Sequence, residues 1–181
     1  ASATFELTNT AGPAAAIATS GGTPQSAIVN TGFAGGLEVT VRDAGNNPVA
    51  GVTVSFAAPG TGASAGLSSS TATTDASGVA SVTATANGTV GVYSVTASIS
   101  GGATATFALT NTAGPATTIA ATGGTPQSVP VFTGFDTLQV TVHDAGNNPV
   151  AGVTVTFAAP NTGPSAALSS GTATTDALGV A

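Results

Sequence analysis

The stretch LEVTVRDAGNNPVAGVTVSF, residues 37–56, decides the fold. Its first part alternates apolar and polar side chains, which is the period of a half-buried β-strand and places Arg42 toward solvent. The segment AGNNPVAG that follows predicts a turn, because Gly and Asn tolerate positive φ and proline interrupts a strand ladder. Alternation then resumes in a second strand. We expect the inward side chains of this pair to be Leu37, Val39, Val41, Val52, Val54 and Phe56.

Later segments repeat this alternation and show no helical period. Residues 75–78 (DASG) predict a turn before a strand at Val79 to Thr85, and Asn87-Gly88 predicts a hairpin between two further strands. Strands separated by tight turns indicate an all-β sandwich. The inward residues expected in the last two strands are Tyr93, Val95, Ala97, Ile99, Phe107 and Leu109.

The chain contains an internal repeat. ATFELTNTAGPA at Ala3 to Ala14 returns as ATFALTNTAGPA at Ala105 to Ala116, at an offset of 102 residues. One residue is lost after Phe33, and residues 37–80 then match residues 138–181 at 36 of 44 positions. Such similarity predicts tandem modules of about 100 residues, the length of a seven-stranded sandwich.

The repeat also predicts the domain boundaries. Residues 1–12 would be the last strand of a preceding module, residues 13–112 a complete immunoglobulin-like module, and residues 113–181 the N-terminal part of a second, truncated module. Because the joint at residues 111–115 is short and contains proline, we expect a rod-like, semi-rigid array. The chain starts at Ala1 and has no Met, so we expect it to be a window on a longer translation product.

Charge and composition exclude several classes of function. Arg42 is the only Lys or Arg among 181 residues, and the net charge is -6. One fixed cation cannot neutralise a row of phosphates, which disfavours nucleic-acid binding and attachment to anionic lipid. No apolar run is long enough to predict membrane insertion in this segment. The chain has no Cys, so disulfides, thiolate metal sites and thiol nucleophiles are excluded, and packing must supply the stability.

DAGNNPVAGVTVSF at residues 43–56, followed by ATTDASGVASVTAT at residues 72–85 and GVYSVTAS at residues 91–98, resembles the bacterial immunoglobulin-like group 1 repeat of invasin- and intimin-type adhesins. The resemblance covers residues 13–111 and the second copy. It implies sandwiches stacked end to end, extracellular at a bacterial cell surface or secreted. It also implies that neighbouring modules of the same or identical chains are the partners, and that a host or surface ligand is bound by parts not present here.

Four aspartates recur with the repeat and are the candidate calcium ligands: Asp43, Asp75, Asp144 and Asp176. Carboxylates near loop carbonyls can hold Ca²⁺, but this ion takes six to eight oxygens and no acidic cluster is present in the sequence. The alternative is turn chemistry, in which each Asp accepts backbone N–H groups. No other cofactor is expected.

His143 is the only histidine and precedes Asp144, an arrangement that invites a hydrolase interpretation. It occupies the position of outward-facing Arg42, however, and no nucleophile and base are paired with it. We therefore expect no catalytic residue and no enzyme activity. Tyr93 is expected to be structural, its hydroxyl tying down a loop as a tyrosine corner does.

Three functions stay open at this point. The first is a non-catalytic structural repeat that gives an adhesin or fibre reach and stiffness. The second is a subunit of a self-assembling extracellular filament, in which a strand such as residues 1–9 completes an open sandwich in another chain by β-strand addition. The third is a carbohydrate-binding module, which the scarcity of aromatic residues disfavours.

Overall fold

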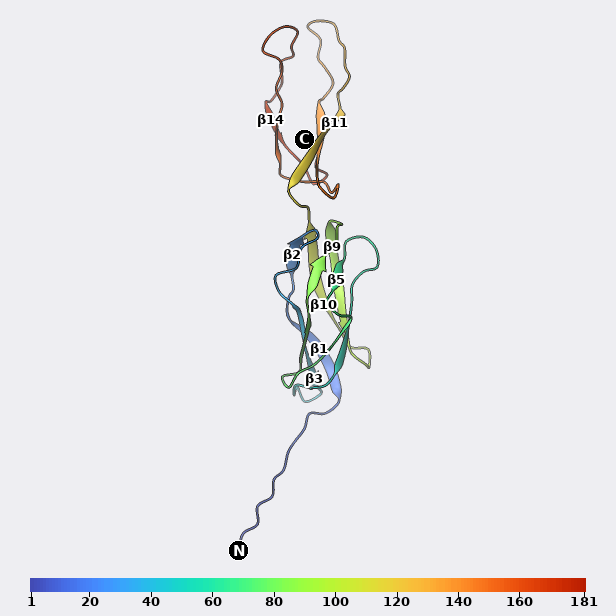
Figure 1. Ribbon diagram of the computed structural model, residues 1–181, viewed down its shortest axis with the longest axis vertical. Helices are drawn as coiled ribbons and strands as arrows, with labels where there is room; N and C mark the ends of the chain where they lie inside the picture. Colours follow the sequence, from blue (N-terminus) through green and yellow to red (C-terminus); the bar gives the residue numbers. More distant parts are fainter. The chain divides into compact units, whose positions relative to one another are not determined.

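The computed structural model describes residues 1–181, which form strands and loops without any helix (Figure 1). The all-β prediction is therefore confirmed. Two compact units are present, Ala1–Thr112 and Ala113–Ala181. The chain contains no helix with the length and apolar character that crossing a bilayer requires.

The first unit is an immunoglobulin-like β-sandwich. One sheet has the order β1-β3-β7, and its last strand is extended by β8, which pairs with β5. The other sheet has the order β2-β10-β9-β4-β6. Every strand pair is antiparallel except β2 and β10, which run parallel. The strand bounds are β1 Ala14–Gly21, β2 Gln25–Ile28, β3 Leu37–Asp43, β4 Thr53–Ala57, β5 Ala65–Leu67, β6 Thr71–Thr73, β7 Val79–Val82, β8 Ala84–Ala86, β9 Gly91–Ser98 and β10 Thr104–Thr112.

The core of this unit lies between the two sheets and consists mostly of small and β-branched side chains. The period-2 pattern placed its main members correctly, because alternate side chains of a strand point to opposite faces. Phe56 of β4 and Phe107 of β10 are buried there, with ring centroids 6.3 Å apart. The side chains with no exposed surface are Leu37, Val39, Val41, Val54, Val95, Ala97, Phe107 and Leu109.

Tight turns fix the register of β3 and β7. Asn46 has a φ of 66° in the predicted turn after β3, a conformation that Asn adopts readily. Gly78, with a φ of 74°, ends the turn before β7, and its N–H donates to the Asp75 carbonyl. A Cβ at Gly78 would lie 2.6 Å from the Val41 carbonyl oxygen, so only glycine fits between this turn and β3.

The hairpin predicted at Asn87-Gly88 is wrong. The strands on either side, β8 and β9, lie in different sheets, so the chain crosses from one sheet to the other at this point. The Asn87 side chain is engaged with other loops: its Oδ1 accepts the Ser64 N–H, and its Nδ2 donates to the Gly62 carbonyl. An Asn-Gly pair favours a two-residue turn only where the flanking strands can pair with each other.

The second unit contains counterparts of β1, β3, β4 and β6, and no counterpart of β9 or β10. The strands β11 and β12 pair with each other, as do β13 and β14. Several apolar side chains are consequently exposed, including Ile119 of β11 at 58 % and Leu138 at 43 %. Leu37, the counterpart of Leu138, has no exposed surface in the first unit. The strand bounds are β11 Ala116–Gly123, β12 Gln139–Asp144, β13 Thr154–Thr156 and β14 Thr172–Thr174.

Residues 1–12 have no regular secondary structure and are exposed. Phe5 is 82 % exposed, whereas its counterpart in β10, Phe107, is fully buried. The two residues lie in nearly the same seven-residue sequence, ATFELTN and ATFALTN. Sequence alone therefore does not make this segment a strand, because it also needs the sheet and core of a module around it.

This pair of phenylalanines gives a direct test of the core. We predict that Phe107→Ala lowers the free energy of unfolding of the first unit by about 3–5 kcal/mol, since it removes a large buried ring and leaves a cavity. Phe5→Ala should change it by less than about 0.5 kcal/mol. Urea unfolding measures both variants, and equal effects would contradict the described core.

Candidate functional site

The four repeated aspartates all accept backbone N–H groups in turns. Asp75 Oδ1 accepts the N–H groups of Ser77 at 2.8 Å and Val79 at 3.0 Å. Asp176 does the same for Leu178 and Val180 in the second unit. These hydrogen bonds match the turn alternative that the sequence offered for both residues.

Asp43 and Asp144 each close a turn and also hold a distant glycine. Asp43 Oδ1 accepts N–H groups of Gly45 and Asn47, while its Oδ2 accepts the N–H of Gly12 at 2.8 Å. The hydrogen bonds from Gly12 and Asn47 lower the pKa of Asp43 to about 2, because they stabilise the ionised carboxylate. Both carboxylates are buried.

Asp144 repeats this arrangement in the second unit. Its Oδ1 accepts N–H groups of Gly146 and Asn148, and its Oδ2 accepts the N–H of Gly114 at 2.9 Å. Burial raises the pKa of Asp144, but the hydrogen bonds from Gly114, Asn148 and Gly146 outweigh it, so the pKa lies below its usual value. The carboxylate is therefore ionised at neutral pH.

The structure gathers no group of three or more His, Asp or Glu side chains that could hold a metal ion. The partners that surround the four aspartate carboxylates are N–H donors, which present positive hydrogens, whereas Ca²⁺ is bound by oxygen ligands. Calcium binding at Asp43, Asp75, Asp144 and Asp176 thus stays a prediction without a second carboxylate at any of the four positions.

His143 lies on β12, partly exposed, at the position that Arg42 occupies on β3. Its backbone carbonyl accepts the Thr117 and Thr118 hydroxyls at 3.4 and 3.5 Å. These contacts belong to the pairing of β11 with β12 and do not form a nucleophile and base arrangement.

Asn111, near the end of β10, is the centre of a buried polar network. Its Oδ1 accepts the Tyr93 hydroxyl at 3.0 Å, and its Nδ2 lies within hydrogen-bond distance of Ser64 O, Asn87 Oδ1 and Thr89 O. Tyr93 is therefore structural, as expected, but its hydroxyl binds a neighbouring strand and reaches the loops only through Asn111. Every buried side-chain polar atom has a hydrogen-bond partner within the fold.

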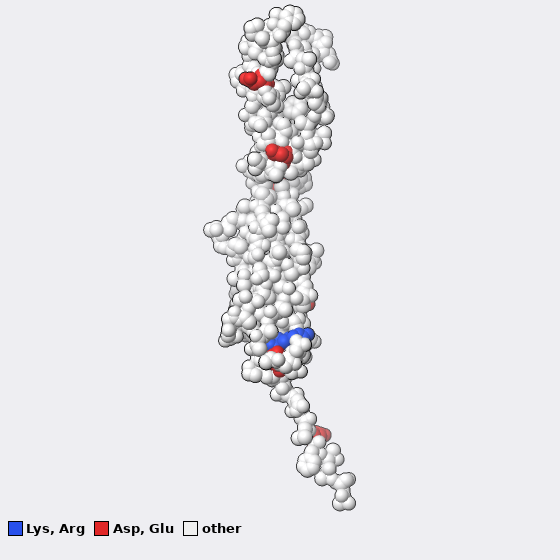
Figure 2. Space-filling view, turned by 180° about the vertical axis from the view of Figure 1, so that it is seen from behind, with Lys and Arg blue, Asp and Glu red and all other residues white.

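The surface carries very little charge. On the face drawn in Figure 2, acidic and basic atoms form only a few separate spots on an otherwise uncharged surface. Arg42 uses its guanidinium to donate to the Asn46 carbonyl at 2.9 Å, within its own turn. No basic patch exists that could follow a phosphate backbone.

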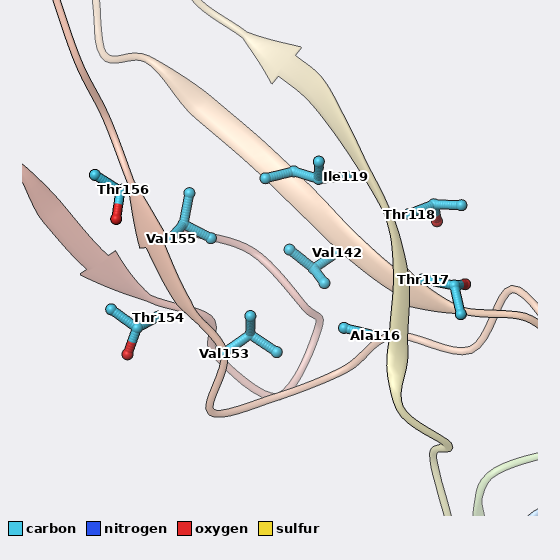
Figure 3. A pocket seen from close by; sticks show the side chains of 9 residues that line it. All are labelled: Ala116, Thr117, Thr118, Ile119, Val142, Val153, Thr154, Val155 and Thr156. Carbon is cyan, nitrogen blue, oxygen red and sulfur yellow. The ribbon is translucent and has the colours of Figure 1, made fainter.

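The second unit has an open groove between β11 and β13, lined by five apolar residues and four threonines. Figure 3 shows Ile119, Val142 and Val155 pointing toward one another across it. In the first unit, the matching β1 and β4 enclose β9 and β10, since β4 pairs with β9 and β1 contacts β10. The groove therefore corresponds to the place that β9 and β10 fill in the first unit. Its lining residues are Ala116, Thr117, Thr118, Ile119, Val142, Val153, Thr154, Val155 and Thr156.

Residues 23–112 match the family model of the bacterial Ig-like domain (group 1). These residues form a bacterial Ig-like domain of group 1. The match confirms the resemblance drawn from residues 43–56 and the segments that follow them. No curated protein sequence matches the chain.

Solved structures of bacterial surface proteins are similar to this Ig-like chain. The adhesin FdeC of Escherichia coli is 21 % identical with a TM-score of 0.47, over 80 % of this chain and 48 % of that one. Invasin, a bacterial integrin-binding protein, is 27 % identical with a TM-score of 0.43, over 81 % and 30 %. The D0-D1 domain of intimin is 24 % identical with a TM-score of 0.41, over 93 % and 82 %. This chain spans about half the length of the FdeC structure.

Two features of the Ig-like domain were missed in the sequence. Asn111 continues the inward series of Phe107 and Leu109, so the period-2 pattern could have placed it in the core. The bonds from Gly12 to Asp43 and from Gly114 to Asp144 join residues 31 and 30 positions apart, and no local pattern reveals such a contact. The only signal was the repetition of NTAGP at residues 9–13 and 111–115.

The lowered pKa of Asp43 predicts a pH dependence. A carboxylate with a depressed pKa stabilises the fold above its unfolded value of 3.8, and this stabilisation is lost as the pH falls through the folded value of about 2. The difference in free energy of unfolding between the native chain and Asp43→Asn should be constant above about pH 5 and shrink from about pH 4 to pH 2.

Urea unfolding at a series of pH values measures this difference. Asp75→Asn is the control, because it removes one carboxylate from a similar turn that holds no linker glycine. A difference between native and Asp43→Asn chains that stays constant down to pH 2 would contradict the prediction.

Proposed function

We propose that this chain is a non-catalytic structural segment of a bacterial surface adhesin or extracellular fibre, in which Ig-like modules supply reach and stiffness. The observation that carries the proposal is the Ig-like domain at residues 23–112, followed directly by a second copy of its sequence. The strand β10 ends at Thr112 and β11 begins at Ala116, so three residues join the two units. A connection this short, with Pro115 in it, favours a stiff array.

The surface and interior also support a spacer role. The buried polar groups are satisfied within the fold, and the aspartates bind turn and linker backbone. The surface is rich in Ser, Thr and Gly and carries few charges, which suits an exported protein that stays soluble without binding polyanions. We infer that the chain acts outside the cell and that ligand recognition belongs to other parts of the protein.

A module exchange in the bacterium that encodes the chain tests the spacer role. Deleting residues 13–112 should reduce adhesion, because the binding region then projects less far from the surface. Replacing them with an unrelated Ig-like module of the same length should restore adhesion. An antibody against residues 13–112 should label the outside of intact cells of the native strain.

If the exchanged module restores length but not adhesion, the module itself carries the ligand site, and a binding role such as carbohydrate recognition replaces the spacer. Labelling confined to the cytoplasm would contradict the surface location. Since both readouts use the whole protein in its cell, neither depends on the stability of the isolated chain.

The filament alternative starts from the sequence of residues 3–9. Residues 3–9 nearly repeat the sequence of residues 105–111 in β10, yet Leu7 is 89 % exposed while Leu109 is fully buried. The open groove of the second unit corresponds to the place where β10 lies in the first. In the filament alternative, a segment such as residues 1–9 of one chain would complete the second unit of another by β-strand addition. One donor strand would still leave the place of β9 empty, since β9 separates β10 from β4.

Light scattering across a range of concentrations tests this alternative. Strand addition predicts association of the native chain, and Leu7→Asp should weaken it at least about tenfold, because a charge would replace an apolar side chain that faces Ile119, Val142 and Val155 in the groove. Thr8→Asp is the matched control, since alternate side chains point away from the groove. A chain that stays monomeric up to about millimolar concentration, or that loses association equally in both variants, would exclude the filament.

A further inference from the structure

The linker before each copy is fastened to the copy that follows it. In the first unit the Gly12 N–H donates to Asp43 Oδ2 at 2.8 Å, and in the second the Gly114 N–H donates to Asp144 Oδ2 at 2.9 Å. The same bond occurs in both copies, although the two units differ in how many strands they contain. It is a property of the local sequence and of the turn after β3 or β12, not of a complete sandwich.

On the other side of the joint, Thr112 is fastened to the first unit. Its carbonyl accepts the Val29 N–H at 2.9 Å, and its hydroxyl donates to the Ala27 carbonyl at 3.2 Å. The preceding residue, Asn111, is the buried centre of the polar network. The backbone of the first unit is therefore held up to and including the carbonyl group of Thr112.

Between these two fastened groups lies very little rotatable chain. Peptide units are planar, so fixing the Thr112 carbonyl also fixes the direction to the Ala113 Cα, and fixing the Gly114 N–H fixes the direction back to the same atom. Only φ and ψ of Ala113 remain free. Because Ala113 carries a Cβ, most of its φ/ψ space is closed by steric clash.

We propose that Ala113 is the sole backbone pivot between the two units, and that Asp144 is the positioning residue that restricts the pivot by holding Gly114. Asp43 has the same role toward the segment before residue 12. This inference deepens the proposed function, since it names the residues that give the array its stiffness. Its biological purpose rests on the proposed function, whereas the restriction of the pivot does not.

Asp144→Asn removes the linker bond and keeps the backbone hydrogen bonds of the turn. The Asn oxygen can replace Asp144 Oδ1 and keep the backbone N–H groups of Gly146 and Asn148. The Asn amide nitrogen would face the Gly114 N–H donor to donor, and it would also meet the Asn148 side-chain amide that Oδ2 accepts at 3.0 Å. Asp176→Asn is the matched control, because Asp176 closes a similar turn through Leu178 and Val180 and makes no hydrogen bond to the linker.

Two measurements on the full 181-residue chain test the proposal. In Asp144→Asn the Gly114 amide should exchange its hydrogen at least about tenfold faster, the loss expected for a hydrogen bond to a charged acceptor, while Gly146 and Asn148 stay protected. Spin labels at Thr73→Cys and Thr174→Cys, which the absence of native Cys makes site-specific, report the distance between the units. The distance distribution should broaden in Asp144→Asn and keep its native width in Asp176→Asn.

Ala113→Gly provides an independent variant that leaves both fastened groups intact. Removing the Cβ opens the φ/ψ space of the pivot, so the distance distribution should broaden while Gly114 exchange keeps its native rate. Unchanged Gly114 exchange in Asp144→Asn would overturn the role of Asp144. An unchanged distribution in Ala113→Gly would overturn the single pivot, even if Asp144→Asn unfolded the second unit. Neither result bears on whether the protein acts at a cell surface, which the module exchange tests.

Discussion

The sandwich depends on the burial of β10, the last strand of the Ig-like domain. This strand pairs with β2 on one side and β9 on the other, and its inward side chains meet both sheets. Phe107 and Leu109 supply apolar surface, and Asn111 ties two loops to the same strand by hydrogen bonds. Residues 113–181 include no counterpart of β10, and there Leu138 is 43 % exposed, whereas its counterpart Leu37 is fully buried in the first unit.

Much of the fold could be predicted from the sequence because its strands are half-buried and antiparallel. One face of each strand packs on the core, so alternation marks the inward residues without knowledge of the partners. The prediction of a hairpin at Asn87-Gly88 was wrong because a turn motif indicates the local backbone preference. It does not indicate the sheet to which the next strand belongs. Residues 1–12 and β10 make the same point, since nearly identical sequence is a strand only where a core receives it.

The candidate site was less predictable. The turn role of Asp75 and Asp176 follows from the local sequence, since their partners lie two and four residues away. The linker bonds of Asp43 and Asp144 could not be predicted, because the fold brings together residues about 30 positions apart in sequence. Asn111 was partly predictable. Its inward position follows from the alternation in β10, but its three acceptors come from two separate loops that the sequence does not bring together. Hydrogen bonds within a turn could thus be predicted from the sequence, whereas polar contacts between distant residues became known only from the structure.

The parallel pairing of β2 with β10 has a mechanical consequence. A pull on the two ends of the Ig-like domain draws β10 in one direction and β2, through β1, in the other. The four residue pairs from Gln25–Leu109 to Ile28–Thr112 then slide against each other together and cannot open one after another. Rupture has to break this group of hydrogen bonds in one step, so the domain keeps its length as tension rises and then yields abruptly. In an array of such domains under tension, each domain would unfold separately once this group of hydrogen bonds breaks.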